Sequence, residues 1–170
     1  RYAKVLHRLV HYYSAHQILE LGTGVGVSTL YLAMGSPEGT IHTMEGSPEK
    51  ATFAKDLFQE AGLENITLWN ADFDHILPEV LHTMKAPPDL VFIDGNHKKD
   101  STLKYIEHIL PYLHNNSILV LDDIHWSSGM EEAWRQIQQY PEITVTIDIF
   151  RMGIMFVKKE LSPQNFIIRY

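Results

Sequence analysis

Residues 18–26 have the sequence Ile18-Leu19-Glu20-Leu21-Gly22-Thr23-Gly24-Val25-Gly26, in which a predicted buried strand ends and a glycine-rich turn begins. Residues 27–34 continue with a helical pattern. Glycine lets the backbone approach a ligand closely, and the first turn of a helix offers N–H groups that have no partner within the helix. This strand, turn and helix therefore predict a nucleotide-type site after the first strand.

The spacing of the glycines separates two kinds of nucleotide site. A dinucleotide fingerprint has the pattern G-x-G-x-x-G, and its last position, counted from Gly22, falls on Val27. The observed pattern is E-x-G-x-G-x-G, with Glu20 directly before the turn. It resembles the first motif of class I S-adenosylmethionine (SAM) methyltransferases, in which the acid faces the methionine end of the cofactor. An NAD-binding oxidoreductase is an alternative that the spacing disfavours.

Length, charge and composition exclude several classes of protein. The 170 residues, 45% of them hydrophobic, suffice for one domain with a sizeable core. A net charge of −7 without a block of Lys and Arg argues against nucleic acid as a partner. The sequence has no cysteine, no apolar run of membrane-spanning length and no signal-peptide pattern, so we expect a cytoplasmic protein without a membrane partner. The chain begins at Arg1, so an upstream segment of the full-length protein can be missing.

Strand-like apolar runs alternate with helical patterns along the chain. Strands are predicted at residues 17–21, 40–45, 66–70, 89–94, 117–121, 143–149 and 153–157, and helices at 2–13, 27–34, 48–61, 74–84, 99–113 and 130–139. Apolar strands separated by helices indicate a parallel sheet covered on both faces. We expect an α/β fold: one doubly wound Rossmann-like domain over residues 1–170, with a mostly parallel seven-stranded sheet and an antiparallel C-terminal strand.

Acidic residues end or follow five successive predicted strands: Glu20, Glu45, Asp72, Asp94, and Asp122 with Asp123. The carboxyl ends of parallel strands form the ligand crevice of such sheets, so these carboxylates are expected at one edge. Each acid can alternatively cap the helix that follows it. Glu45 lies at the distance from Gly22 where a carboxylate accepts both ribose hydroxyls.

The resemblance assigns Asp72 to the exocyclic amine of adenine and Phe73 to the face of the base. The family often has a bulky apolar residue after the ribose acid, whereas this chain has Gly46. Taken together, the resemblance implies that the cofactor contacts Glu20, Gly22, Thr23, Gly24, Glu45, Gly46, Asp72, Phe73 and Asp94.

A second group of residues follows the fourth and fifth strands. His97 lies three residues after Asp94, and Asp122 and Asp123 follow the next strand. Neighbouring strands lie ~4.8 Å apart, so the three aspartates are expected to meet in one oxygen-rich site that suits Mg²⁺. His97 is the predicted catalytic base, because its ordinary pKa lies nearest neutrality. The alternative is that His97 and one of the acids only cap helices.

This group resembles the magnesium-dependent sugar O-methyltransferases of macrolide antibiotic pathways, which have Asp-x-x-His after one strand and an acid pair after the next. Catechol and caffeoyl-CoA O-methyltransferases share the scheme, with Asp-Asn as the pair and lysine in place of His97. The resemblance spans residues 18–157. It implies SAM-dependent O-methylation of a small hydroxylated molecule, with metal assistance from Asp94, Asp122 and Asp123.

Two alternatives remain open: a metal-independent SAM methyltransferase that uses His97 alone, and a non-catalytic SAM-binding protein. Trp126 is expected either to stack on an acceptor or to anchor the next helix as a buried side chain. The acceptor, the presence of a metal and the oligomeric state, with a homodimer among the options, are not determined by the sequence.

Overall fold

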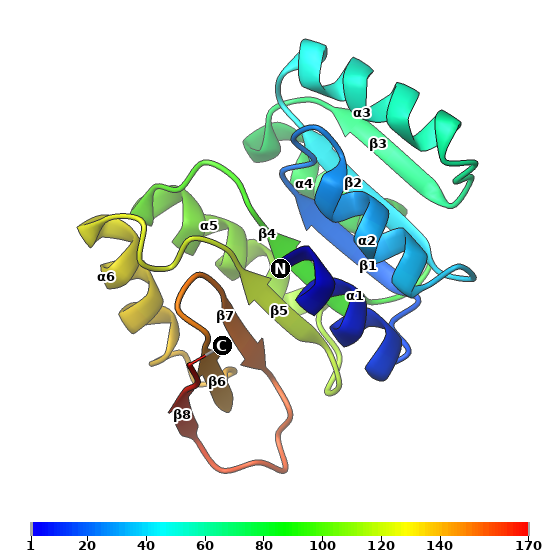
Figure 1. The fold of residues 1–170 in the computed structure, drawn as a ribbon. Helices are drawn as coiled ribbons and strands as arrows, with labels where there is room; N and C mark the ends of the chain where they lie inside the picture. Colours follow the sequence, from blue (N-terminus) through cyan, green and yellow to red (C-terminus); the bar gives the residue numbers. More distant parts are fainter. Residues whose placement is uncertain (1, 170) are drawn as a thin grey trace. The chain divides into compact units, whose positions relative to one another are not determined.

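The computed structural model describes residues 2–169, and the chain divides into two compact units, residues 1–90 and 91–170. Strands and helices alternate along the first unit, whereas the second unit ends in three consecutive strands (Figure 1). None of the helices in residues 2–169 is both long and apolar enough to cross a membrane. The predicted cofactor residues other than Asp94 lie in the first unit, and the predicted metal and base residues lie in the second.

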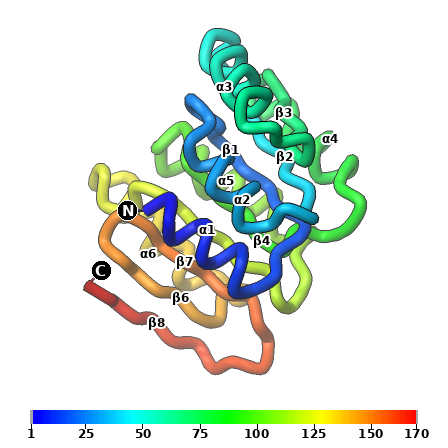
Figure 2. The backbone as a smooth tube through the Cα atoms, turned by 45° about the vertical axis from the view of Figure 1, so that its right-hand side comes forward, coloured from blue at the N-terminus to red at the C-terminus, as the bar shows by residue number. Residues whose placement is uncertain are grey.

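The first unit contains three parallel strands in the spatial order β3-β2-β1. These strands are β1 (Gln17–Leu21), β2 (Thr40–Glu45) and β3 (Ile66–Asn70), with the predicted bounds. Its helices are α1 (Tyr2–Tyr12), α2 (Val27–Gly35), α3 (Pro48–Glu60) and α4 (Phe73–Thr83). Helices α1 and α2 pack side by side, as Figures 1 and 2 show.

The second unit has the strand order β4-β5-β7-β6-β8. The strands are β4 (Leu90–Ile93), β5 (Ile118–Leu121), β6 (Val145–Asp148), β7 (Gly153–Phe156) and β8 (Gln164–Ile167). Its helices are α5 (Lys99–Ile109), which a short 3₁₀ turn (Leu110–Tyr112) extends, and α6 (Ser128–Ile137). The predicted antiparallel strand is β7, which pairs antiparallel with both β5 and β6. It follows that β5 and β6 point the same way.

The predicted count of seven strands is wrong, because residues 2–169 contain eight. The additional strand, β8, pairs parallel with β6 and lies beside it in Figures 1 and 2. All four of its residues are exposed, so it lacks the buried apolar run from which strands were predicted. Strand β8 is held by backbone pairing, which leaves no signature in a hydrophobic pattern.

Local signals fix the helices that follow the strand ends. Ser47 caps α3 by accepting a hydrogen bond from the Lys50 N–H, and Pro48 opens that helix. Ser127 caps α6 in the same way, so α6 begins at Ser128 and not at residue 130 as predicted. Helix α2 differs because Gly26 precedes it and provides no side-chain cap. Its first turn therefore keeps backbone N–H groups that lack a partner within the helix.

Candidate functional site

The glycine-rich turn in the first unit is attached to the end of β2. The backbone N–H groups of Gly22 and Thr23 both donate to the carbonyl oxygen of Met44, at 3.0 Å each. The three glycines have positive φ values of 104°, 55° and 88° in sequence order. Side chains rarely tolerate this left-handed region, which explains why glycine occupies every second position.

Glu45 links this turn to the start of α3. Its Oε2 accepts a hydrogen bond from the Gly24 N–H at 2.8 Å, and its Oε1 accepts one from the Ser47 N–H at 2.9 Å. The residue is only 8% exposed. Each carboxylate oxygen can accept a second hydrogen bond. Glu45 can therefore hold the turn and still accept two hydroxyl groups from a ligand.

Glu20 lies beneath the turn and has no exposed surface. Its Oε2 accepts hydrogen bonds from the hydroxyl groups of Thr29 and Thr43, at 2.5 and 2.6 Å. Burial raises the pKa of Glu20, and hydrogen bonds from nearby hydroxyl groups, including these two, oppose that rise. Glu20 thus joins β1, α2 and β2. Its predicted contact with a cofactor stays a prediction.

The other predicted cofactor residues of the first unit differ in exposure. Thr23 is buried, and its hydroxyl lies 2.6 Å from that of Thr43. Asp72 caps α4 by accepting the Asp74 N–H at 2.9 Å, and two thirds of its side chain is exposed. A Cβ added at Gly46 would meet no atom within 4 Å. Helix capping accounts for the position of Asp72, so the adenine contacts of Asp72 and Phe73 also stay predictions.

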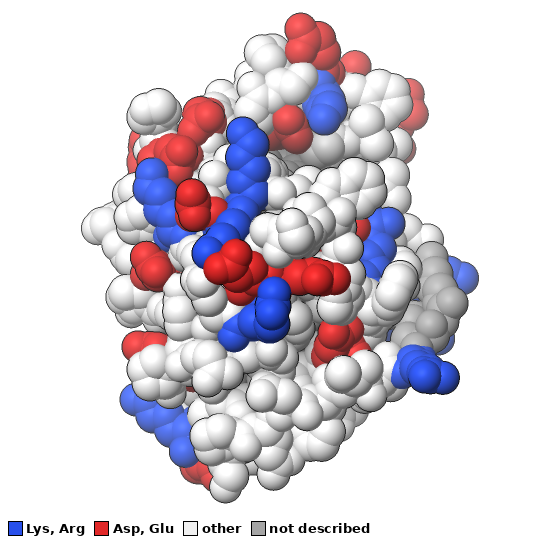
Figure 3. Space-filling model, turned by 90° about the vertical axis from the view of Figure 1, so that its left-hand side faces the viewer, with Lys and Arg blue, Asp and Glu red and all other residues white. Residues whose placement is uncertain are grey.

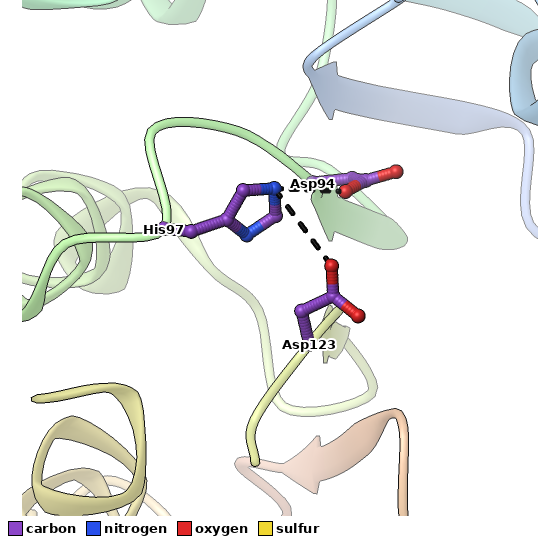
Figure 4. Close-up of side chains that lie close together, drawn as sticks. All are labelled: Asp94, His97 and Asp123. Carbon is purple, nitrogen blue, oxygen red and sulfur yellow. Dashed lines mark ion pairs between the residues drawn. The ribbon is translucent and has the colours of Figure 1, made fainter. Parts of the chain in front are cut away.

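Three of the residues predicted from strand ends meet in the second unit. Figure 4 shows the His97 imidazole pointing toward the carboxylates of Asp94 and Asp123. The Nε2 atom of His97 lies 3.6 Å from Oδ1 of Asp94 and 3.9 Å from Oδ2 of Asp123. Each side chain is between 21% and 33% exposed, so a ligand can reach the group. We call Asp94, His97 and Asp123 the histidine cluster.

The backbone around the histidine cluster is strained. Asn96, His97, Asp123 and Phe150 have positive φ values of 64°, 25°, 53° and 75°. Ser14 is the only other non-glycine residue with a positive φ in residues 2–169. Such conformations cost about 1–3 kcal/mol each and concentrate at functional sites. The free energy of unfolding is therefore lower than it would be with relaxed loops, and contacts elsewhere in the fold must compensate this cost.

Asp122 does not join the histidine cluster. It is 1% exposed, and its carboxylate faces the guanidinium of Arg151. The Nη2 atom of Arg151 donates to Oδ2 of Asp122 at 2.8 Å, and Nε lies 3.1 Å from Oδ1. The same Nε lies 3.3 Å from Oδ1 of Asp123.

The predicted Mg²⁺ site of Asp94, Asp122 and Asp123 stays a prediction, and the structure departs from it at Asp122, which lies outside the histidine cluster. Its carboxylate already has a cationic partner, because Arg151 follows β6 and lies at the same strand end as the acid pair. Ligand-type atoms of the histidine cluster do lie within 4.8 Å of one another. However, the permanently charged guanidinium of Arg151 lies next to Asp123. The three-aspartate arrangement that the metal prediction required does not form.

Aromatic side chains lie exposed next to this region. Trp126 is 72% exposed and Phe150 is 74% exposed, so the alternative of a buried Trp126 is wrong. The ring of Phe150 lies 5.9 Å from that of His125. His125 Nε2 in turn lies 2.9 Å from Oδ2 of Asp148. These contacts join the loop after β5 to the turn after β6.

The sequence reasoning missed Arg151 and Asp148. Both lie at or just after the end of β6, which runs parallel to β5. The expectation that side chains after parallel strands meet at one edge of the sheet applies equally to this turn. The signal was an arginine three residues after a strand end.

Charges of both signs lie close together on the face shown in Figure 3. Lys and Arg side chains, drawn in blue, lie next to Asp and Glu side chains, drawn in red, over much of that face. Among the described residues, Lys99 and Glu132 form an ion pair, with Nζ and Oε1 2.6 Å apart. On this face the drawn charges are of both signs.

A family model described as a methyltransferase domain matches residues 19–124, more than half of the chain. The chain belongs to this methyltransferase family. The matched segment contains the glycine-rich turn, Glu45, the histidine cluster and Asp122, and it ends before Arg151. The family assignment agrees with the first predicted motif and not with the dinucleotide alternative.

Individual proteins named as O-methyltransferases are also similar to this chain. A catechol O-methyltransferase of Mycobacterium tuberculosis (strain H37Rv) is 30% identical over 121 residues, which make up 68% of this chain and 51% of that protein. One of Niastella koreensis is 30% identical over 123 residues, 71% of this chain and 55% of that protein. The chain spans about half the length of the curated relatives it matches.

Solved structures confirm the predicted α/β Rossmann-like fold. The cofactor-bound protein Rv0187 from MTB has a TM-score of 0.80 and 25% identity, over 92% of this chain and 79% of that one.

Proposed function

We propose that this protein transfers the methyl group of SAM to an oxygen atom of a small hydroxylated acceptor. The observation that carries the proposal is the His97 imidazole, held between the carboxylates of Asp94 and Asp123 in a chain of the methyltransferase family. The relatives named catechol O-methyltransferase and the cofactor-bound structural neighbour support it.

The first unit supplies the cofactor-binding residues of this proposal. The backbone of residues 22–26 would hold the methionine portion of SAM, and Glu45 would accept hydrogen bonds from the ribose hydroxyls. The first turn of α2 has no side-chain cap, so its N–H groups suit the cofactor carboxylate. SAM, when bound, supplies an electrophilic methyl group.

The second unit supplies the base. With SAM bound, the acceptor oxygen would attack the methyl carbon, and the carbon–sulfur bond would break as the carbon–oxygen bond forms. His97 Nε2 takes the hydroxyl proton, and the carboxylates of Asp94 and Asp123 stabilise the resulting imidazolium. A positioned base of this kind contributes about 10²- to 10⁴-fold to the rate. The products are a methyl ether and S-adenosylhomocysteine (SAH).

The position of Arg151 supports one of the two catalytic versions predicted from the sequence. Its guanidinium occupies the acid pair that was expected to hold Mg²⁺, which favours the version in which His97 acts without a metal. A non-catalytic SAM-binding protein would not need strained backbone at His97. A cytoplasmic location and a homodimer stay predictions.

The test is transfer of a labelled methyl group from SAM to a panel of catechols and hydroxylated sugars. The wild-type protein should form SAH and one O-methylated product in equal amounts. His97→Gln should lower kcat by about 10²-fold or more while the affinity for SAH stays within about twofold. Equal rates for wild type and variant, or transfer to nitrogen only, would contradict the proposal.

A further inference from the structure

Arg151 makes the most extensive polar contacts with the acid pair after β5. It donates through Nη2 to Oδ2 of Asp122 at 2.8 Å and through Nε to both oxygens of that carboxylate, at 3.1 and 3.2 Å. The distance from Nε to Oδ1 of Asp123 is 3.3 Å. A planar guanidinium suits this geometry, because it presents several N–H donors in a fixed fork.

The position of Arg151 is built by two loops that hold each other. The Ile124 N–H donates to the carbonyl oxygen of Arg151 at 3.1 Å. Asp148 accepts the Phe150 N–H at 2.7 Å and contacts His125 across the loops. Phe150, directly before Arg151, has a positive φ of 75°. The turn is therefore fixed on both sides of the arginine, and the guanidinium is directed at the acid pair.

The Asp122 carboxylate is buried, so it depends on the positive charge of Arg151. Asp122 is 1% exposed, and a buried carboxylate is costly unless a positive charge and hydrogen bonds compensate it. The Asp122 carboxylate, with the charges of Asp123 and Asp94, raises the pKa of Arg151 further, so the guanidinium stays charged at every pH of interest. A divalent ion on the pair would have to displace this charge or lie beside it.

We propose that Arg151 takes the place of a divalent cation at the Asp122–Asp123 pair. It neutralises the two carboxylates and, through Asp123, positions His97. The protein as it exists should therefore bind Mg²⁺ weakly, and its methyl transfer should not need a metal. The part that concerns methyl transfer rests on the proposed function, whereas the metal-binding part does not.

Metal binding by calorimetry tests the inference without SAM or an acceptor. Wild-type protein should give no saturable heat with Mg²⁺ or Mn²⁺ below millimolar concentration. Arg151→Gln removes the cation and leaves two uncompensated carboxylates, so it should bind Mn²⁺ at least about tenfold more tightly than the wild type. Arg151→Lys keeps the charge and should behave like the wild type. Arg135→Gln, at an exposed arginine on α6, is the matched control and should also leave metal binding unchanged.

Thermal unfolding with and without Mn²⁺ covers the case in which Arg151→Gln is unstable. Added Mn²⁺ should then raise the midpoint of that variant and leave the midpoints of wild type and Arg151→Lys unchanged. In the activity assay, excess EDTA should leave kcat of the wild type unchanged, and Arg151→Gln should regain activity on addition of Mn²⁺. Saturable micromolar Mg²⁺ binding by the wild type, or identical metal binding by wild type and Arg151→Gln, would overturn the inference. A wild type without methyl transfer but with these binding results would refute only the proposed function.

Discussion

Glu20 lies one residue before the end of β1 and Glu45 ends the neighbouring strand β2, yet the two carboxylates have different surroundings. Glu20 is completely buried and bonded to hydroxyl groups, whereas Glu45 accepts backbone N–H groups from the glycine-rich turn and from Ser47. Glu45 holds the turn directly, whereas Oε1 of Glu20 is buried without a hydrogen-bond partner among the described residues. The sequence placed both residues at strand ends but did not distinguish these environments.

Substitution of Glu45 tests its assignment to the ribose. Glu45→Ala removes charge-assisted hydrogen bonds and should weaken SAH binding by about 1.5–3 kcal/mol, which is roughly 10- to 150-fold in Kd. Calorimetry measures the change. Glu49→Ala, at an exposed glutamate of α3, is the control and should bind SAH as the wild type does. Equal affinities for the two variants would remove Glu45 from the cofactor site.

The buried Glu20 predicts a pH dependence of stability. Its pKa in the folded protein is raised above the ordinary value of 4.5, mainly by burial. As the pH rises above that value, the unfolded chain loses the proton while the folded chain keeps it, so Glu20 makes the wild type progressively less stable until its folded pKa is passed. Glu20→Gln cannot titrate, so its free energy of unfolding relative to wild type should increase from pH 4.5 to pH 8.

Urea denaturation of both proteins at several pH values measures this difference. Glu49→Gln provides a control of opposite sign, because hydrogen bonds from its own backbone N–H and from Ser47 lower the pKa of Glu49. Its stability relative to wild type should fall as the pH rises toward the ordinary value of 4.5 and should hardly change above it. A Glu20→Gln difference that does not vary with pH would show that Glu20 titrates normally.

The turn between β1 and α2 depends on glycine for two separate reasons. Gly26 has a φ of +88°, and a Cβ there would lie 2.8 Å from Cε1 of Phe58 on α3. Gly24 has a φ of +55° but open space around it. The turn is thus shaped by backbone conformation at both glycines and by packing against α3 at one of them.

Alanine substitutions separate these contributions. Gly26→Ala should lower the free energy of unfolding by about 1–3 kcal/mol, through strained φ and the clash with Phe58. In a double-mutant cycle, adding Phe58→Leu to Gly26→Ala should restore only that part of the lost free energy of unfolding that comes from the clash. Gly46→Ala, where no atom lies within 4 Å, should leave stability unchanged. Equal losses for Gly26→Ala and Gly46→Ala would contradict this account of the turn.

Elements with a buried apolar pattern were predictable, and contacts between loops were not. The bounds of β1, β2 and β3 match the expectation, because their apolar runs end abruptly at turn residues. Strand β8 was missed because nothing in it is buried. Arg151 was missed because its partners are distant in sequence and are brought to it by two strained loops.

The same contrast applies to the candidate site as a whole. Strand-end reasoning brought Asp94, His97 and Asp123 together correctly, because parallel strands present their carboxyl ends at one edge. It failed for Asp122, whose carboxylate turns to Arg151 instead of joining the histidine cluster. The direction of a side chain at a strand end depends on the loop that follows. Because a loop has no hydrophobic periodicity, the sequence pattern does not predict that direction.

A crystal structure of the protein grown with SAH tests the central claim most directly. The account predicts SAH on residues 22–26, with both ribose hydroxyls on Glu45 and with the Gly24 N–H still bonded to that carboxylate. SAH bound elsewhere with an empty glycine-rich turn, or a ribose that makes no contact with Glu45, would contradict it.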